Sequence, residues 1–286
     1  MPKKTSRCTP HLARAKTRGA ARAFLAAALG TFAACSVSTQ QEVEMGVNYS
    51  AQIARELPLL ADPEARQYIN VLGDSLASVT DQRNLEWHFT IVDSREVNAF
   101  AVPGGWIYVN RGLIERAQSL SQVAGVISHE IGHITKRHSI QQMQKAQGAN
   151  LGVTLGCILT RICESGLGQA GIQIAGGAIF AKFSRQDESE ADVEGVRTLV
   201  RAGIDPAGIP EMFRILLDER KERPAGVDAW FTTHPLEEDR IATTNAVIAQ
   251  YPASELRGLT KDSPRFQAFK RHLLSLPPSP PPRRRG

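Results

Sequence analysis

The stretch VISHEIGHITKRH at residues 126–138 constrains this chain most, because it places two histidines and a glutamate within five consecutive positions. On an α-helix, residues four positions apart lie on the same face, so His129 and His133 can direct their imidazoles at one point. Zn²⁺ accepts such ring nitrogens, and Glu130 is placed to take a proton from water activated there. The isoleucines of the stretch indicate a buried helix, in which three ionisable groups need partners. The pattern therefore predicts a zinc-binding helix rather than a chance polar patch in a core.

Two histidines leave a zinc site incomplete, and the third ligand decides the class of the site. A histidine six residues after His133 would indicate a metzincin, but Ser139 occupies that position. His138 lies about 140° around the helix from His133 and is expected to point away from the metal. The remaining candidate is Glu188, which we place on a separate helix within the sequence SRQDESEADVEGV at residues 184–196.

The segment 184–196 has two faces when it is drawn as a helix. The inward face holds Glu188, Asp192, Gly195 and Leu199, which lie within roughly 40° to 60° of one another on a helical wheel. The opposite face, which we expect to lie toward water, holds Glu190, Glu194 and Arg197. An inward glutamate followed by an inward aspartate is costly unless both have partners, and a metal ligand plus an acceptor for a histidine N–H would satisfy the pair. Ala191 and Gly195 are small and leave room for the H-E-x-x-H helix to approach.

Four motifs in a fixed order resemble a known family. They are NAFAVPGG at 98–105, H-E-x-x-H at 129–133, SRQDESEAD at 184–192 and THPLEEDR at 233–240. Together they are similar to the HtpX-like and BepA-like zinc metalloendopeptidases, peptidase family forty-eight of the metallo-class, which are gluzincins. The resemblance covers residues 42–250.

The resemblance implies both a site and a fold. The ligands of one Zn²⁺ per chain would be His129, His133 and Glu188, with Glu130 as catalytic base and Asp192 as the acceptor behind a histidine ligand. The fold would be α+β and mostly α-helical, a gluzincin-type metalloprotease domain with a small β-sheet or hairpin beside the H-E-x-x-H helix.

Two further motifs have candidate roles at the site, and each has a structural alternative. The edge of the NAFAVPGG hairpin could pair with an extended substrate and bring its scissile carbonyl over the zinc, or the hairpin could be only structural. The candidate residues of this edge are Asn98, Ala99, Phe100 and Ala101. His234 is a candidate fourth ligand that blocks water, a donor to the developing oxyanion, or a cap of the following helix. Arg240 is the alternative oxyanion donor.

The N-terminal segment has the pattern of a bacterial export signal. Residues 1–34 hold seven cations and no acid, and AFLAAALGTFAAC is an apolar run that suits a signal peptide but is too short to span a bilayer. The run ends in a lipobox-like sequence, which predicts lipidation of Cys35 rather than simple cleavage nearby. We therefore expect an exported protein of the bacterial cell envelope, lipid-anchored to the outer membrane and facing the periplasm.

Composition sets the remaining boundaries. Residues 35–45 are polar and predict a tether, 46–275 are expected to form the zinc metalloprotease domain, and 276–286 to be a disordered Pro/Arg tail. Residues 148–181 are rich in small and apolar types, which suits a packed helix pair or a mobile flap. This segment contains Cys157 and Cys163, for which the sequence allows two alternatives: a disulfide between them, or two unpaired cysteines.

Periodicity and turn residues predict the order of the elements. Helices are expected at 42–60, 63–79, 112–118, 186–202, 206–220 and 236–250, the second of them with Asp62 as its N-cap. The helix that carries the H-E-x-x-H sequence is expected to begin after an N-cap at Ser121. A strand is expected at 87–94, followed by a hairpin around 103–105.

The net charge of +5 gives no support to a nucleic-acid partner. The leader contributes +7, so the remainder carries 5 − 7 = −2. Together these features predict a zinc-dependent endopeptidase that cleaves misfolded or misassembled envelope polypeptides by metal-activated water with Glu130 as general base. The lipid anchor would make the membrane a second partner. The alternatives are a periplasmic chaperone or assembly factor with a latent zinc site, and a metal-dependent hydrolase of cell-wall material.

Overall fold

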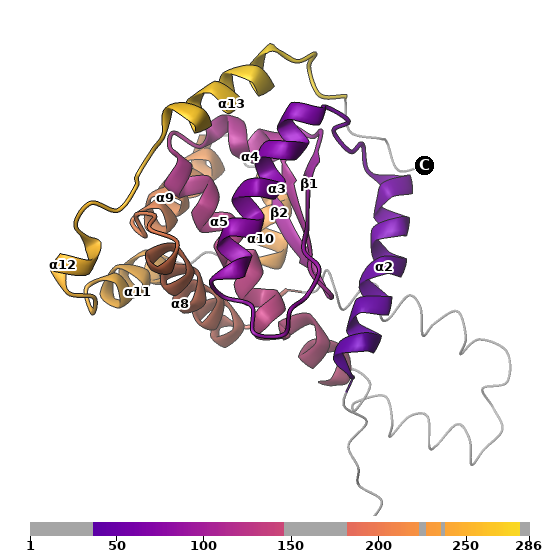
Figure 1. The fold of residues 1–286 in the computed structure, drawn as a ribbon, viewed down its shortest axis with the longest axis horizontal. Coiled ribbons are helices and arrows are strands. Elements are labelled where there is room, and N and C mark those ends of the chain that lie inside the picture. The colour runs from indigo at the N-terminus through magenta and orange to yellow at the C-terminus, as the bar shows by residue number, and fades with distance from the viewer. Residues whose placement is uncertain (1–36, 146–181, 223–226, 236–237, 281–286) are drawn as a thin grey trace, which may run out of the picture. The chain divides into compact units, whose positions relative to one another are not determined.

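The computed structural model describes residues 37–145, 182–222, 227–235 and 238–280. The predictions about the export signal, Cys35, residues 148–181 and the end of the tail lie outside the described residues. The described residues form an α+β fold that is mostly helical, which confirms the predicted fold class (Figure 1). Within this part of the chain, every helix falls short of the length and hydrophobicity that a transmembrane span requires.

The sheet has three strands in the order β1-β3-β2, namely β1 (His88–Val92), β2 (Ala99–Val102) and β3 (Trp106–Asn110). β2 and β3 form the predicted hairpin, and β1 pairs with β3 in parallel. The turn residues Gly104 and Gly105 have φ angles of 84° and 103°, which glycine adopts without steric cost. β2 lies at the edge of the sheet, and no strand within the described part of the chain pairs with its outer side.

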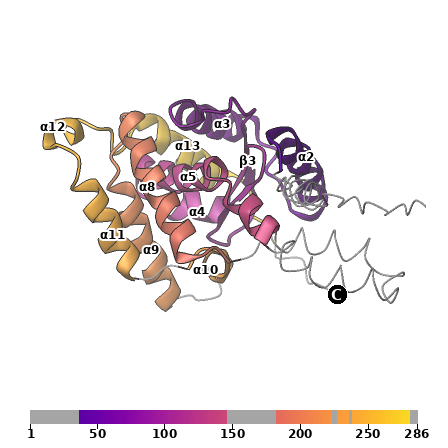
Figure 2. The same cartoon turned by 90° about the horizontal axis from the view of Figure 1, so that it is seen from below.

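Two helices carry most of the site. The helix α5 (Leu120–Thr135) contains the H-E-x-x-H sequence, and α8 (Arg185–Arg201) packs along it (Figure 2). Small residues allow this close approach: a Cβ on Gly132 would lie 3.0 Å from the backbone of Ala191, and a Cβ on Gly195 would lie 3.4 Å from the backbone nitrogen of His129. Larger side chains at these positions would push the two helices apart.

The other helices surround this pair and the sheet. They are α2 (Thr39–Glu56), α3 (Pro63–Ser78), α4 (Arg111–Arg116), α9 (Gly208–Glu222), α10 (Asp228–Thr233), α11 (Glu238–Ile248), α12 (Ala253–Leu256) and α13 (Pro264–Ser275). The main core joins all three strands to residues of α3, α5, α8, α9 and α13. Asp62 caps α3 as predicted, whereas α5 begins after Ser119 rather than Ser121. The helices α10, α12 and α13 were not predicted.

Helix α2 begins inside residues 35–45, where the sequence suggested a polar tether. The Ser38 side chain accepts a hydrogen bond in the first turn, in a reciprocal capping box. Glu42 is only 1% exposed and lies 2.8 Å from both Arg83 and Arg137. The tether interpretation is therefore wrong for the residues of α2, because their polar side chains are fixed by a cap and a buried ion-pair cluster that composition does not reveal.

The segment predicted as a disordered tail, 276–286, begins as part of the folded domain. Arg111 is 3% exposed and donates a 2.7 Å hydrogen bond to the carbonyl of Pro277. Ser279 is buried and its hydroxyl donates to Asp93 at 2.7 Å. The proline-rich sequence prevents regular structure here, as predicted, but these backbone and hydroxyl contacts hold its first residues against the domain.

Candidate metal centre

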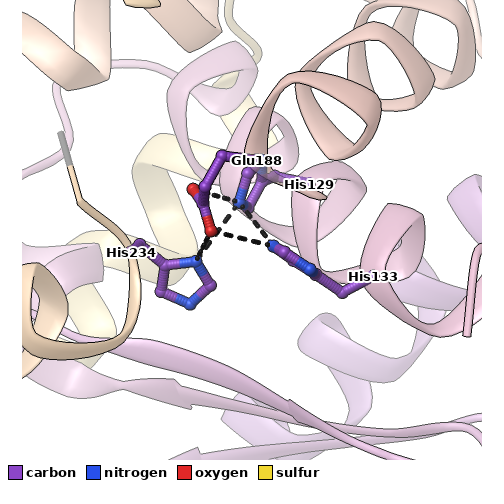
Figure 3. A group of neighbouring side chains, drawn as sticks. All are labelled: His129, His133, Glu188 and His234. Atoms are coloured by element: carbon purple, nitrogen blue, oxygen red, sulfur yellow. Dashed lines mark hydrogen bonds and ion pairs between the residues drawn. The ribbon is translucent and has the colours of Figure 1, made fainter. Parts of the chain in front are cut away.

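Four buried side chains converge on one point: His129, His133, Glu188 and His234 (Figure 3). The Nε2 atoms of the first two lie 3.0 Å apart, and the Glu188 carboxylate lies 3.5 Å from each. His234 Nδ1 is 3.0 Å from Glu188 Oε1. Donors of a tetrahedral zinc site lie about 3.3 Å apart when each bond is about 2.0 to 2.1 Å long. The observed spacing therefore fits four donors around a single ion.

Local structure places each donor. The helical register of α5 stacks His129 and His133 on one face. The N-terminus of α8 is fixed by Ser184, whose side chain accepts from the backbone of Asp187 in a reciprocal capping box, and Glu188 lies in the first turn of that helix. His234 follows directly after α10, where its backbone N–H bonds the carbonyl of Trp230 at 2.8 Å.

A carboxylate and a guanidinium lie behind His129. The Asp192 carboxylate is 2.8 Å from His129 Nδ1, and Arg240 binds the same carboxylate with two hydrogen bonds of 2.9 and 2.7 Å. Arg240 Nη1 also lies 2.5 Å from Glu188 Oε2. Burial lowers the pKa of Arg240, but the two carboxylates outweigh burial and raise it. The residue considered as an alternative oxyanion donor is thus engaged by two carboxylates.

The ring of His133 has two neighbours that the sequence did not indicate. Its Nδ1 atom lies 2.9 Å from His138 Nδ1, and Phe183 stacks on the ring at a centroid distance of 3.9 Å. His138 is not one of the four converging residues, as predicted, but its ring contacts the ring of His133 instead of pointing away from it. The wheel angle did not apply, because Arg137 has a φ of 60° and ends the helical path before His138.

Glu130 is the group that most needs a partner. It is 0% exposed, and neither carboxylate oxygen has a hydrogen-bond partner among the residues that the structure describes. His234 Nε2 lies 3.5 Å from Glu130 Oε1. Burial raises the pKa of Glu130 above its usual value. An orphaned buried carboxylate beside converging donors is expected where water and an ion complete a site.

Charge balance supports a divalent cation. When fully ionised, the carboxylates Glu130, Glu188 and Asp192 carry −3 and Arg240 carries +1, which leaves −3 + 1 = −2 in a buried space. Burial lowers the pKa of His129, but Asp192 and Glu188 outweigh burial and raise it to about 9, so in the metal-free protein a proton on His129 offsets part of the charge that a bound cation would neutralise. Burial alone raises the pKa of Glu188, but His234 and Arg240 reverse this effect and hold it well below the usual value, so this carboxylate stays ionised. One divalent ion would neutralise the site, and the imidazole and carboxylate donor set suits zinc.

The two faces predicted for α8 are only partly correct. Glu188 is 1% exposed and Glu190 is half-exposed, as expected. Glu194, which we placed toward water, is buried and pairs with Lys136 at 3.1 Å and Arg197 at 2.7 Å. The close packing of α5 on α8 covers this side of α8, and no helical wheel of a single helix can show that.

The hairpin edge lies beside the H-E-x-x-H helix but outside the four-residue cluster. Helix α5 packs against β2, which contains three of the four candidate residues. The Asn110 N–H bonds the Asn98 carbonyl at 2.9 Å, and the antiparallel ladder then alternates along β2. The backbone N–H and C=O groups of Ala99 and Ala101 therefore point to the outer edge of the sheet.

An H-E-x-x-H helix completed by a glutamate from a second helix defines the site of a gluzincin-type metallopeptidase. The chain belongs to Peptidase family M48: the model of this family matches residues 63–248, a range that includes all four motifs. The resemblance drawn from those motifs is confirmed at the level of the family.

Several curated proteins are similar to this chain. The "Beta-barrel assembly-enhancing protease" of Escherichia coli (strain K12) is 34% identical over 222 residues, 75% of this chain and 45% of that protein. The "Putative beta-barrel assembly-enhancing protease" of Vibrio cholerae is 33% identical over 236 residues, covering 80% and 48%. The "Metalloprotease LoiP" of Escherichia coli (strain K12) is 31% identical over 157 residues, covering 54% and 59%. The chain thus spans about half the length of the curated relatives it matches.

Proposed function

We propose that this chain is a zinc-dependent endopeptidase that hydrolyses misfolded or misassembled envelope proteins. The observation that carries the proposal is the convergence of three donors, His129, His133 and Glu188, beside the orphaned carboxylate of Glu130. Membership of Peptidase family M48 supports the endopeptidase activity. The similarity to proteins named beta-barrel assembly-enhancing proteases supports β-barrel proteins of the envelope as substrates.

Each residue of the site has a defined task in this proposal. The three donors would hold the ion, which when bound would supply Lewis-acid activation of water and of the scissile carbonyl. Glu130 would accept a proton from the attacking water and return it to the leaving amine. Asp192 orients His129 through its Nδ1 atom, and Arg240 holds the carboxylates of Asp192 and Glu188 in position, which assigns it a positioning role rather than oxyanion stabilisation.

Substrate would bind as an added strand along β2, at residues 98–101. The backbone groups of Ala99 and Ala101 that do not pair with β3 would bond an extended polypeptide, and the neighbouring α5 would then face its scissile bond. Ala99 is 0% and Ala101 6% exposed, so an added strand would first have to displace the groups that cover this edge. Backbone pairing does not read side chains, so this mode supports cleavage with loose sequence preference. Such a preference suits an enzyme that acts on unfolded chains.

Removal of the metal tests the proposal directly. Purified protein should produce fragments from casein or an unfolded β-barrel polypeptide, lose this activity in a strong chelator and regain it after one equivalent of zinc. Metal analysis should find about one zinc per chain. Binding of these polypeptides with no fragments under any metal condition would instead favour the periplasmic chaperone with a latent site.

His234 would be a fourth ligand that closes the site. Its Nδ1 atom lies 3.0 Å from Glu188 Oε1 and 3.4 Å from His129 Nε2, among the other donors. Four protein donors leave no coordination position for water, whereas catalytic zinc sites keep one open. The described arrangement would therefore be a resting state, and His234 would have to withdraw before hydrolysis.

Substitution of His234 by Ala should raise the rate of hydrolysis. If the closed state holds about 90% of the molecules, its loss should increase activity about tenfold. A matched control is His272→Ala, which removes a histidine paired with Asp62 outside the cluster. A drop of about a hundredfold in the His234→Ala protein, with zinc retained, would show that His234 serves the oxyanion and would refute the closing role.

We also propose that the chain is exported and lipid-anchored at Cys35 to the outer membrane, facing the periplasm. The basic leader, the short apolar run and the FAAC sequence support this proposal. Mass spectrometry of the mature protein should find an acylated cysteine as the first residue. A mature N-terminus that is unmodified and is not Cys35 would contradict the proposed lipid anchor, but it would not bear on the peptidase proposal.

A further inference from the structure

A chain of two contacts runs outward from the second histidine of the H-E-x-x-H sequence. His133 Nδ1 lies 2.9 Å from His138 Nδ1, and His138 Nε2 lies 3.4 Å from Glu190 Oε2. His138 is buried, whereas the Glu190 side chain is 43% exposed and reaches the chain from the surface of α8. The sequence H-x-x-x-x-H at 133–138 therefore connects the candidate ligand to a carboxylate through one imidazole.

The proton positions along this chain follow from the chemistry of imidazole. If His133 gives Nε2 to the ion, its ring proton must be on Nδ1, since a neutral imidazole carries one N–H. That N–H can donate only to an unprotonated Nδ1 of His138. His138 then carries its own proton on Nε2, the atom that faces the carboxylate of Glu190. Both contacts thus have a single consistent direction, from His133 through His138 to Glu190.

We propose that His138 is a positioning residue that fixes the tautomer and ring orientation of His133, with Glu190 fixing His138 in turn. The inference rests on the proposed zinc site. It gives the two histidine ligands equivalent support: Asp192 contacts His129 directly, whereas Glu190 reaches His133 through a second imidazole. Glu188, Glu190 and Asp192 all lie on α8, so the docking of one helix would set the third ligand and both supports.

The geometry around His138 explains why an imidazole occupies this place. The left-handed Arg137 returns the chain toward α5, and the ring of His138 lies 5.0 Å from that of His133 in an edge-on arrangement. The ring of Phe183 stacks on the ring of His133, and this contact restricts rotation of the His133 ring. A rigid flat ring with an acceptor on one side and a donor on the other spans the distance to Glu190, which a carboxylate at position 138 could not do.

Zinc affinity measured by competition with a chromophoric chelator tests the role of His138 without relying on activity. His138→Ala should weaken zinc binding by about 10 to 100-fold, the usual cost of losing such support. His138→Asn places an amide oxygen near the position of Nδ1 and should recover most of the affinity. Glu190→Gln, at a half-exposed position that does not endanger folding, should weaken zinc binding by a few fold. His272→Ala is the matched control, because it breaks a histidine–carboxylate pair outside the cluster.

A second readout separates positioning from a general loss of stability. Nitrogen NMR of the zinc-loaded protein should find the proton of His133 on Nδ1 and that of His138 on Nε2. Wild-type zinc affinity in both His138→Ala and Glu190→Gln, or a His138 proton on Nδ1, would overturn the inference while the zinc site stands. A wild-type protein that binds no zinc would instead overturn the proposed function.

Discussion

Glu130→Gln should lower peptide hydrolysis by about a hundred to ten-thousandfold while the protein still binds one zinc. The amide has nearly the same shape as the carboxylate but cannot take a proton from water, and general-base catalysis accounts for a factor of this size. Glu130 has no hydrogen-bond partner among the described residues, so the substitution breaks no existing bond and the fold should be unaffected. Fragment production from casein, together with metal analysis, gives both quantities.

The comparison is sharpest when two further proteins are measured. Glu56→Gln neutralises an exposed glutamate on α2 and should leave both quantities unchanged. The Glu130→Gln substitution should also be combined with His234→Ala, so that a closed resting site cannot hide the difference. If Glu130→Gln cleaves at the wild-type rate in that background, the residue is not the general base.

Arg240→Met should lower the free energy of unfolding by about 3 to 5 kcal/mol in the zinc-free protein. Removal of one partner from a buried ion pair leaves the other charges without compensation, and the cost is of this size. Here the groups that lose their guanidinium partner are the carboxylates of Asp192 and Glu188, both buried. Burial raises the pKa of Asp192, and Arg240 is the first of the groups that reverse this and keep it ionised. Chemical denaturation in chelator measures the change.

Arg197→Met is the matched control for Arg240→Met. It removes a guanidinium whose side chain is 41% exposed and pairs with Glu194, and it should cost at most about 1 kcal/mol. Zinc should reduce the deficit of Arg240→Met, because a divalent ion compensates Glu188. Equal stabilities of the Arg240→Met and Arg197→Met proteins would mean that the cluster does not depend on this charge.

The sequence was sufficient to predict which of the buried polar side chains share a helix face, since i,i+4 spacing determines this. That rule gave His129 with His133 and Glu188 with Asp192, and the structure brings both pairs together. The small residues that allow α5 and α8 to pack closely could also be identified, because only short side chains permit backbone contact.

The parts that were missed depend on where helices end and on which helices cover them. His138 contacts His133 because a left-handed residue ends α5, and no periodic pattern reports that event. Trp230 stacks on His234 at 4.6 Å, but it lies on the short helix α10, which has no repeating apolar pattern. Polar composition misjudged Glu42 and the helical wheel misjudged Glu194, because other segments of the chain cover each of them and supply a cation that pairs with it.

The contacts of Arg111 determine where this chain can be shortened. Its guanidinium is buried and donates to the carbonyls of Leu273, Leu276 and Pro277, so these terminal residues solvate a cation that water cannot reach. A protein ended at the last residue of α13 would lose the carbonyls of Leu276 and Pro277 and leave this buried cation with only Leu273, Glu115 and Asp93 as partners among the described residues. Recombinant versions intended for crystallisation should therefore extend at least to Ser279, which closes the same network through Asp93.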